Sequence, residues 1–244
     1  ANPKIVKNSK AIESLSYKEA MELSFFGAKV IYFPTLQPLI EKSIPAYIKN
    51  TFDKDAIGTC ISNKGENNEE STIKGISHIE KISLINFEGS GMVGVPGFSK
   101  RFFGALSERG INVIMITQAS SEFSICVAVK ESDANNAKIS IDKEFEYEIS
   151  QRKINECQIE NSLSNIAIVG DKMKSKKGVS GKLFSTLGNN NINIRAIAQG
   201  ASERNISIII DEKDNTKALN SLHEAFFENN CKNLHLFITG VGNV

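Results

Sequence analysis

Hydrophobic positions follow a helical period in some segments and a strand period in others, and the order of these segments occurs twice. The first copy predicts helices at 98–108 and 133–145, with strands at 82–87, 113–117, 123–129 and 147–149. The second predicts helices at 179–187 and 215–227, with strands at 166–169, 194–198 and 206–210. Each copy has the order βαββαβ, which predicts an α+β fold with two helices on one face of a four-stranded antiparallel sheet.

The two copies also share polar positions. Asn112 and Gln118 of the first copy recur 81 residues later as Asn193 and Gln199. A packing constraint would need to repeat only the apolar period. The shared polar residues therefore predict two related sites, although amides of this kind can also serve only to satisfy strand ends and turns.

The segment before the repeats has signals of its own. Ser16 and Glu19 form a capping-box pattern and Gly27 can end the helix that follows, which predicts a helix over 16–27. Strands are expected at 28–32 and 44–49, with a break at the prolines between them. We expect this organisation: an N-terminal piece at 1–62, a polar linker at 63–75, repeat units at 76–150 and 151–232, and a further strand with a glycine turn at 233–244.

Composition narrows the classes of function. Lys plus Arg number 29 and Asp plus Glu number 28, so a net charge of +1 does not favour nucleic acid or an acidic membrane as a partner. No apolar run approaches the roughly 20 residues of a membrane helix. The four cysteines and three histidines have no metal-ligand spacing, so we expect reduced thiols in a cytoplasmic protein and no metal site. Both ends look cut, and we expect a fragment of a longer polypeptide.

The repeat carries the groups of a small-molecule pocket. Glycines before each first helix let the backbone approach a ligand, and the helix N-terminus offers N–H groups to a carboxylate. These glycines are Gly89, Gly91, Gly94 and Gly97 in the first copy, and Gly170 and Gly178 in the second. Gln118 and Gln199 have amides that can hold an ammonium or a hydroxyl group. No nucleophile–base pair accompanies them, so we expect binding of a small amino acid and no catalytic residue.

At this point the residues resemble a known family. Residues 79–230 look like the paired ACT regulatory domains of aspartate kinase, and the motifs 117–122 and 197–204 resemble the branch fused to homoserine dehydrogenase. Residues 16–62 resemble the C-terminal end of the α/β amino-acid-kinase domain. Residues 236–244 look like the first strand and glycine turn of the dehydrogenase's dinucleotide-binding domain.

The resemblance implies roles for individual residues. Gln118 and Gln199 would contact the effector, with Asn112 and its repeat partner Asn193 nearby. The first pocket would be lined by Met92, Val95, Phe98, Ser99, Asn112, Val113 and Ile114. Lys29 and Val30 would lie at the kinase's ATP site, although Tyr32-Phe33-Pro34 departs from the usual His-Pro there. Gly240 and Gly242 would belong to a truncated NAD(P) motif.

The implied function is threonine feedback on a bifunctional aspartate kinase–homoserine dehydrogenase. The parent would use ATP with Mg and NAD(P), and would form a homodimer or higher oligomer through its ACT domains. The fragment alone would need no cofactor and would be inactive. Two alternatives are a lysine-responsive monofunctional aspartate kinase and a structural dimerisation module with degenerate pockets. Lysines 172, 174, 176 and 177 replace the first copy's glycine-rich stretch, so we expect unequal pockets, with the Gln118 site the stronger.

Overall fold

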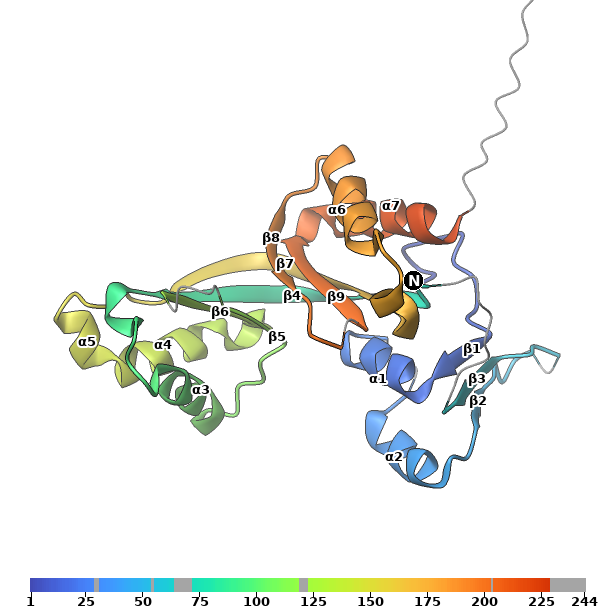
Figure 1. Ribbon diagram of the computed structural model, residues 1–244, viewed down its shortest axis with the longest axis horizontal. Coiled ribbons are helices and arrows are strands. Elements are labelled where there is room, and N and C mark those ends of the chain that lie inside the picture. The colour runs from blue at the N-terminus through green and yellow to red at the C-terminus, as the bar shows by residue number, and fades with distance from the viewer. Residues whose placement is uncertain (29–30, 54, 64–71, 119–122, 203, 229–244) are drawn as a thin grey trace, which may run out of the picture.

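The computed structural model describes all residues except 29–30, 54, 64–71, 119–122, 203 and 229–244. Most of the expected linker, the ATP-site residues Lys29 and Val30, and the terminal strand with Gly240 and Gly242 therefore lie outside the described residues. The N-terminal piece packs beside one of two sheet-and-helix units, and two long strands run from that unit into the other (Figure 1). No helix of the described chain is both long and apolar enough to cross a membrane.

The N-terminal piece is a small sheet with two helices. Strands β1 (Ser14–Ser16) and β2 (Ala46–Ile48) pair with the central β3 (Thr59–Ser62), parallel and antiparallel respectively. Helix α1 spans Tyr17–Phe25, and the expected capping box is present, with the Glu19 N–H donating to Ser16 Oγ at 3.0 Å. Gly27 follows α1 with φ +98°, a left-handed conformation that favours glycine.

Two expectations for this piece were wrong. Ala28, Ile31 and Tyr32, the described residues of 28–32, form no strand. The prolines do not break the chain after them, because helix α2 (Phe33–Lys42) contains both. Pro34 lies in the first turn, where the N–H groups have no partner within the helix, so its missing donor costs little.

The repeats form one six-stranded antiparallel sheet in the order β5-β6-β4-β7-β9-β8. Two long central strands, β4 (Gly75–Glu88) and β7 (Gln158–Val169), lie side by side, and shorter pairs flank them. The flanking strands are β5 (Met115–Gln118), β6 (Ser124–Lys130), β8 (Ile194–Ala198) and β9 (Asn205–Asp211).

Each long strand is divided between the two units. Residues 82–88 of β4 pair with β6, whereas residues 75–79 pair with the far end of β7. The register shifts between these halves, close to Lys81 and Ser162, which occupy the same repeat position and both have positive φ (56° and 59°). The strand near Ile76 therefore completes the second unit, and the start of β7 completes the first.

The predicted fourth strand of the first unit was wrong. Residues 146–150 form the short helix α5 (Glu146–Ser150) directly after α4 (Ala134–Glu144). Phe145, at the junction, is fully buried in the first unit's core, and Glu148 pairs with Arg101 of α3. These two contacts keep the segment against α3, and the start of β7 provides the fourth strand instead.

Because the sheet curls, the helices of the two units lie on opposite sides of it in Figure 1, while its other face carries one buried cluster, with Leu84 and Ile209 among its members, that spans both halves. Helices α3 (Phe98–Glu108), α4 and α5 pack on the first half, over a core rich in phenylalanine. Helices α6 (Val179–Asn189) and α7 (Asn215–Phe227) pack on the second half, over leucine and isoleucine. Short 3-10 helices precede these helices: η1 (Ser90–Met92), η2 (Glu131–Asp133), η3 (Asp171–Ser175) and η4 (Glu212–Asp214). The expected α+β architecture of paired βαββαβ units is confirmed.

Candidate binding site

Two cavities lie at equivalent places in the two units. Nine of the ten positions that line the second cavity lie 81 residues after a position that lines the first, and both sets include the repeated glutamine. The first cavity, of ≈ 560 Å³, is lined by Met92, Gly94, Val95, Pro96, Gly97, Phe98, Ser99, Lys100, Gln118 and Ile125. The second, of ≈ 260 Å³, is lined by Met173, Lys174, Lys176, Lys177, Gly178, Val179, Ser180, Gly181, Gln199 and Ile206.

Each cavity lies at the N-terminus of a long helix. Gly97 caps α3 with φ +96°, and Gly178 caps α6 with φ +90°. Glycine has no side-chain acceptor for the first-turn N–H groups, so these groups are left to other acceptors. The positive end of the helix dipole lies there too, and the site can accept a carboxylate.

The rest of each wall combines apolar and amide groups. Met92 and Ile125 are buried beneath the first cavity, and Met173 and Ile206 occupy the same places in the second. Gln118 ends β5, and its exposed amide borders the cavity from the edge of the sheet. A ligand there meets an apolar floor, backbone donors on one side and an amide on the other.

The structure brings some of the expected residues together and leaves others apart. Met92, Val95, Phe98, Ser99 and Gln118 line the first cavity, and Gln199 lines the second. Asn112, Val113 and Ile114 do not line the first, and Asn193 does not line the second. Asn112 and Asn193 are exposed in the turns before β5 and β8, and Ile114 is buried in a cluster on the helix-free face.

Sequence reasoning missed several lining residues. Pro96 and Lys100 in the first cavity, and Ser180 in the second, were not singled out. The repeat offset could have found them, because each lies at the position equivalent to a lining residue of the other unit.

The glycines divide into two groups with different roles. Gly94, Gly97 and Gly178 border open space at positive φ, as expected for a ligand-facing turn. Gly89 and Gly170 instead approach the protein's own backbone. A Cβ would lie 2.5 Å from Ile154 Cα in the first case and 2.2 Å from the Thr72 oxygen in the second. The expectation that these two glycines make room for a ligand was wrong.

The two cavities differ in charge. Val95 and Pro96 in the first correspond to Lys176 and Lys177 in the second, and Lys174 lines the second as well. The second cavity is also smaller. The expected inequality of the pockets is therefore present in the geometry.

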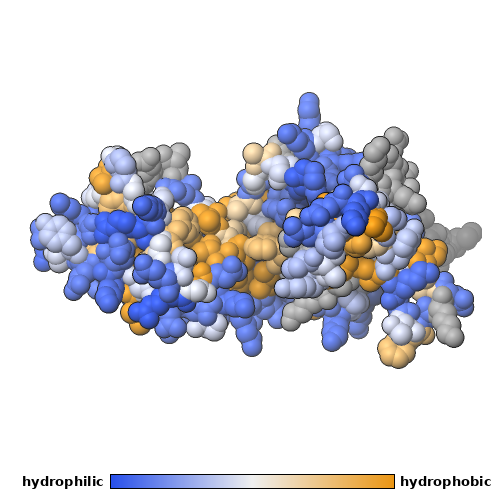
Figure 2. Space-filling model, turned by 90° about the horizontal axis from the view of Figure 1, so that it is seen from below, coloured by the Kyte–Doolittle hydropathy of each residue, from blue (hydrophilic) through white to orange (hydrophobic). Residues whose placement is uncertain are grey.

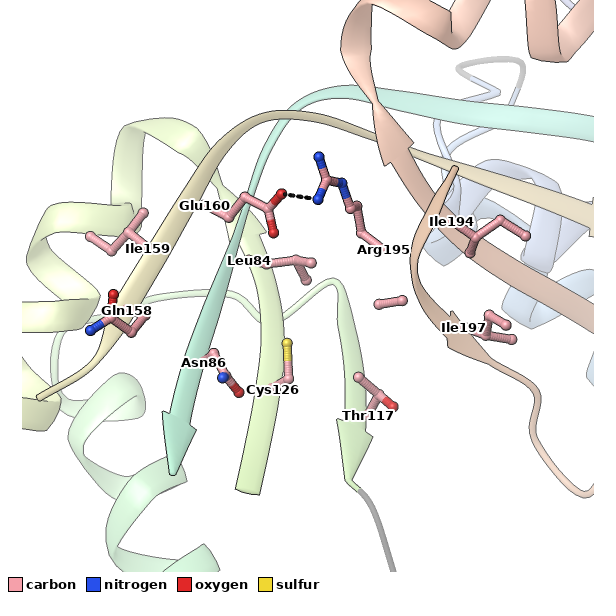
Figure 3. A pocket seen from close by; sticks show the side chains of 11 residues that line it. Leu84, Asn86, Thr117, Cys126, Gln158, Ile159, Glu160, Ile194, Arg195 and Ile197 are labelled. Atoms are coloured by element: carbon pink, nitrogen blue, oxygen red, sulfur yellow. Dashed lines mark ion pairs between the residues drawn. The ribbon is translucent and has the colours of Figure 1, made fainter. Parts of the chain in front are cut away.

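A third hollow, of ≈ 710 Å³, lies on the helix-free face where the sheet curls and strands β5 and β8 approach each other. Arg195 of β8 reaches across to Glu160 of β7 at 3.2 Å (Figure 3) and also pairs with Asp211 at 3.0 Å. Figure 2 shows apolar side chains gathered between the two lobes of the molecule. The Arg195–Glu160 ion pair joins the two units at the point where the sheet curls.

Among the described residues, no group of three His, Cys, Asp or Glu side chains could hold a metal ion.

Cys126 lines this hollow and provides a test of its burial. Burial and the nearby Glu160 carboxylate raise the pKa of the Cys126 thiol to about 11, and burial raises the pKa of Cys157 further. Because the thiolate is the reactive form, we expect iodoacetamide at pH 8 to modify Cys60 well before either. Peptide mapping by mass spectrometry, with the denatured chain as the control, measures this order. Labelling of Cys126 as fast in the native as in the denatured chain would contradict it.

The fold and the paired cavities define a class: a tandem ferredoxin-like module with one cavity at an equivalent place in each unit. The ACT domain profile matches residues 85–145 and 166–226, half of the chain. The chain belongs to the ACT domain family.

Its relatives are aspartokinases. A bifunctional aspartokinase/homoserine dehydrogenase of Haemophilus influenzae is 41% identical over 243 residues, which is 100% of this chain and 30% of that protein. Clostridium acetobutylicum aspartate kinase superposes with a TM-score of 0.80 at 30% identity, over 92% of this chain and 51% of that one. Aspartokinase III of E. coli with lysine and aspartate (T-state) gives 0.74 at 26% identity, over 93% and 49%. The chain is thus similar to the ACT-bearing regulatory region of aspartokinases and spans under a third of the bifunctional relative.

Proposed function

We propose that the chain is the effector-binding regulatory segment of a bifunctional aspartate kinase–homoserine dehydrogenase, and that its effector is threonine. The pair of equivalent pockets carries this proposal. Each joins a helix N-terminus that has no side-chain cap to a glutamine amide across an apolar floor, at positions 81 residues apart. A dimerisation module with degenerate pockets would not need to keep both of these groups twice.

The chemistry of the first pocket favours a small neutral amino acid. The N–H groups of the first turn of α3 would hold the carboxylate, and the Gln118 amide oxygen would accept from the ammonium or the hydroxyl group. Val95 and Phe98 would contact the methyl group. Among the described lining residues there is no carboxylate, and Lys100 adds positive charge. A lysine effector would therefore have no partner for its side-chain ammonium among these residues, which favours threonine over lysine.

The parent enzyme would phosphorylate aspartate with ATP and Mg and would reduce aspartate semialdehyde with NAD(P). Lys29 and Val30 would contribute to the ATP site, and Gly240 and Gly242 to the dinucleotide site. The similarity to bifunctional aspartokinase/homoserine dehydrogenases supports the two activities proposed for the parent. Threonine would favour the inhibited state by a coupling free energy of about 1–3 kcal/mol, the usual range. We further propose a cytoplasmic homodimer or higher oligomer, paired through the open edges of the sheet.

Calorimetric titration of threonine, lysine and methionine into the chain tests the effector. We expect saturable threonine binding, and Gln118→Ala to weaken it by about ten- to a hundredfold at the first site, because a lost hydrogen bond to a charged group costs about 1.5–3 kcal/mol. Gln199→Ala should act in the same way on the second site. Asn112→Ala, outside the cavity, is the control and should bind like wild type. Tighter binding of lysine than of threonine would exclude the proposal.

The 244-residue chain should show no kinase activity by itself. It spans half of the solved aspartate kinase chain that it matches. A hydroxamate assay with aspartate and ATP measures aspartyl phosphate formation, with the full-length enzyme as the positive control. ATP-dependent product from the purified chain would contradict this prediction.

A further inference from the structure

Helix α1 of the N-terminal piece is held at its N-terminus by the second ACT unit (Figure 1). Glu19 is 4% exposed, and its carboxylate accepts from two backbone N–H groups, one on Ser16 and one on Asp171, each at 2.9 Å. The Ser16 hydroxyl donates to the Asp171 carboxylate. The capping box that starts α1 therefore shares its polar groups with the residue that starts η3.

Asp171 also joins the two walls of the second pocket. Its other carboxylate oxygen accepts from Arg204 Nε at 3.0 Å. Arg204 lies five residues after Gln199, on the segment that leads from the glutamine into β9. On the other wall, η3 runs from Asp171 to the pocket residues Met173 and Lys174. If either η3 or the segment from Gln199 to Arg204 is displaced, the Asp171 carboxylate is displaced with it.

Close contacts along α1 continue this link toward its C-terminal end. Asn205 Nδ2 donates to Glu22 at 2.6 Å, and Ser77 Oγ donates to the Phe26 carbonyl at 2.6 Å. A Cβ at Gly27 would lie 2.4 Å from the His78 oxygen, so the end of the helix touches the sheet backbone. Helix α1 is thus bonded to the second unit at both of its ends.

Among its described residues the first unit has no equivalent ion pair, and it serves as an internal comparison. The equivalents of Asp171 and Arg204 are Ser90 and Phe123. The backbone bridge is the same in both units: Gly89 N–H donates to the Phe123 oxygen at 3.0 Å, and Gly170 N–H to the Arg204 oxygen at 2.9 Å. Phe123 is 42% exposed, however, and cannot form an ion pair. Only the charged pair of the second unit is added to this shared geometry.

We propose that Asp171, held by Arg204, is the positioning residue through which occupancy of the second pocket is transmitted to the N-cap of α1. This rests on the proposed function, because it needs an effector in the Gln199 pocket. A ligand that pulls η3 or the Gln199 segment moves the Asp171 carboxylate and its N–H group. The cap of α1 then loses or strengthens hydrogen bonds at Ser16 and Glu19, and the helix carries the change to Gly27.

Hydrogen exchange of the α1 amides, with and without threonine, tests this in the 244-residue chain. Asp171→Asn keeps the shape of the side chain and removes its charge. We expect it to accelerate α1 exchange without ligand, and to remove most of the threonine-dependent change in α1 exchange. Asp211→Asn is the matched control. It breaks an Arg–Asp pair of the same length in the same unit, away from α1.

The outcomes separate this inference from the proposed function. If threonine binds by calorimetry but Asp171→Asn and Arg204→Gln both keep the wild-type α1 response, the inference is overturned and the function stands. If threonine does not bind, the function fails, and ligand-free exchange still decides whether Asp171 holds the cap. Arg204→Gln provides a second variant in case Asp171→Asn does not fold, and it should give the same loss. Equal acceleration by Asp211→Asn would also overturn the inference.

Discussion

Replacing Phe102 by alanine is expected to lower the free energy of unfolding by about 3–5 kcal/mol, the usual cost of truncating a buried phenylalanine. Phe102 is 0% exposed, and its ring centroid lies 5.6 Å from that of Phe87, which packs in turn on Phe145. Alanine would leave a cavity between α3 and the first half of the sheet, with rigid strands on one side that cannot close it. Denaturant titration followed by circular dichroism measures the loss.

This change should also distinguish the two pockets. Phe102 lies one turn after Phe98, which lines the first cavity and stacks on Phe145 at 5.3 Å. Loosening α3 moves the N–H groups proposed to hold the carboxylate. We expect threonine binding at the first site to weaken while the second site, on α6, keeps its affinity. Ile139→Ala is the control, because that side chain is 60% exposed on α4. If Ile139→Ala lowered the free energy of unfolding as much as Phe102→Ala does, the loss could not be attributed to the buried position of Phe102.

Local signals in the sequence predicted those parts of the fold that local interactions determine. Helices 98–108 and 215–227 match the structure because an apolar face recurs at the helical period and finds the sheet beneath it. The capping box at Ser16 and Glu19 holds because both partners lie within one turn. The pocket was predictable for a different reason: duplication preserved the chemistry of Gln118 and Gln199 at a fixed spacing.

The misses came from partners far apart in the chain. The alternating pattern at 147–149 suits a strand, but Phe145 and Glu148 bind α3 and keep the segment helical. The division of β4 between two units depends on its pairing with β7, about eighty residues away, which no local pattern encodes. In the sequence, Asp171 is only one acidic residue before a lysine-rich turn. Its importance appears only when Ser16 and Arg204 come within hydrogen-bond distance.

Gly170→Ala is the second change for which we expect a large loss of stability, because Gly170 lies against the chain that enters β4, a strand shared by both units. Gly170 has extended backbone, with φ 177°, so alanine causes no backbone strain. The cost is steric: the new Cβ would lie 2.2 Å from the Thr72 oxygen and 3.0 Å from Ile73 Cα. The chain entering β4 is fixed there by Lys74 N–H, which donates to the Val169 oxygen at 2.8 Å. We expect about 3 kcal/mol of destabilisation, at the upper end for overpacking.

Whether Gly170→Ala destabilises one unit or both tests whether the shared strand β4 couples the two units. Residues 75–79 of β4 complete the second unit, and 82–88 begin the first. Displacing the start of β4 should therefore destabilise both units together, and the α1 contact at Ser77 with them. Calorimetry should show one transition that shifts as a whole. Gly188→Ala in α6 is the control: no atom lies within 4 Å of its Cβ, and alanine should stabilise the helix by about 0.5–1 kcal/mol. If Gly170→Ala split the melt into two transitions, with the first unit unchanged, the units would be energetically independent despite the strands that they share.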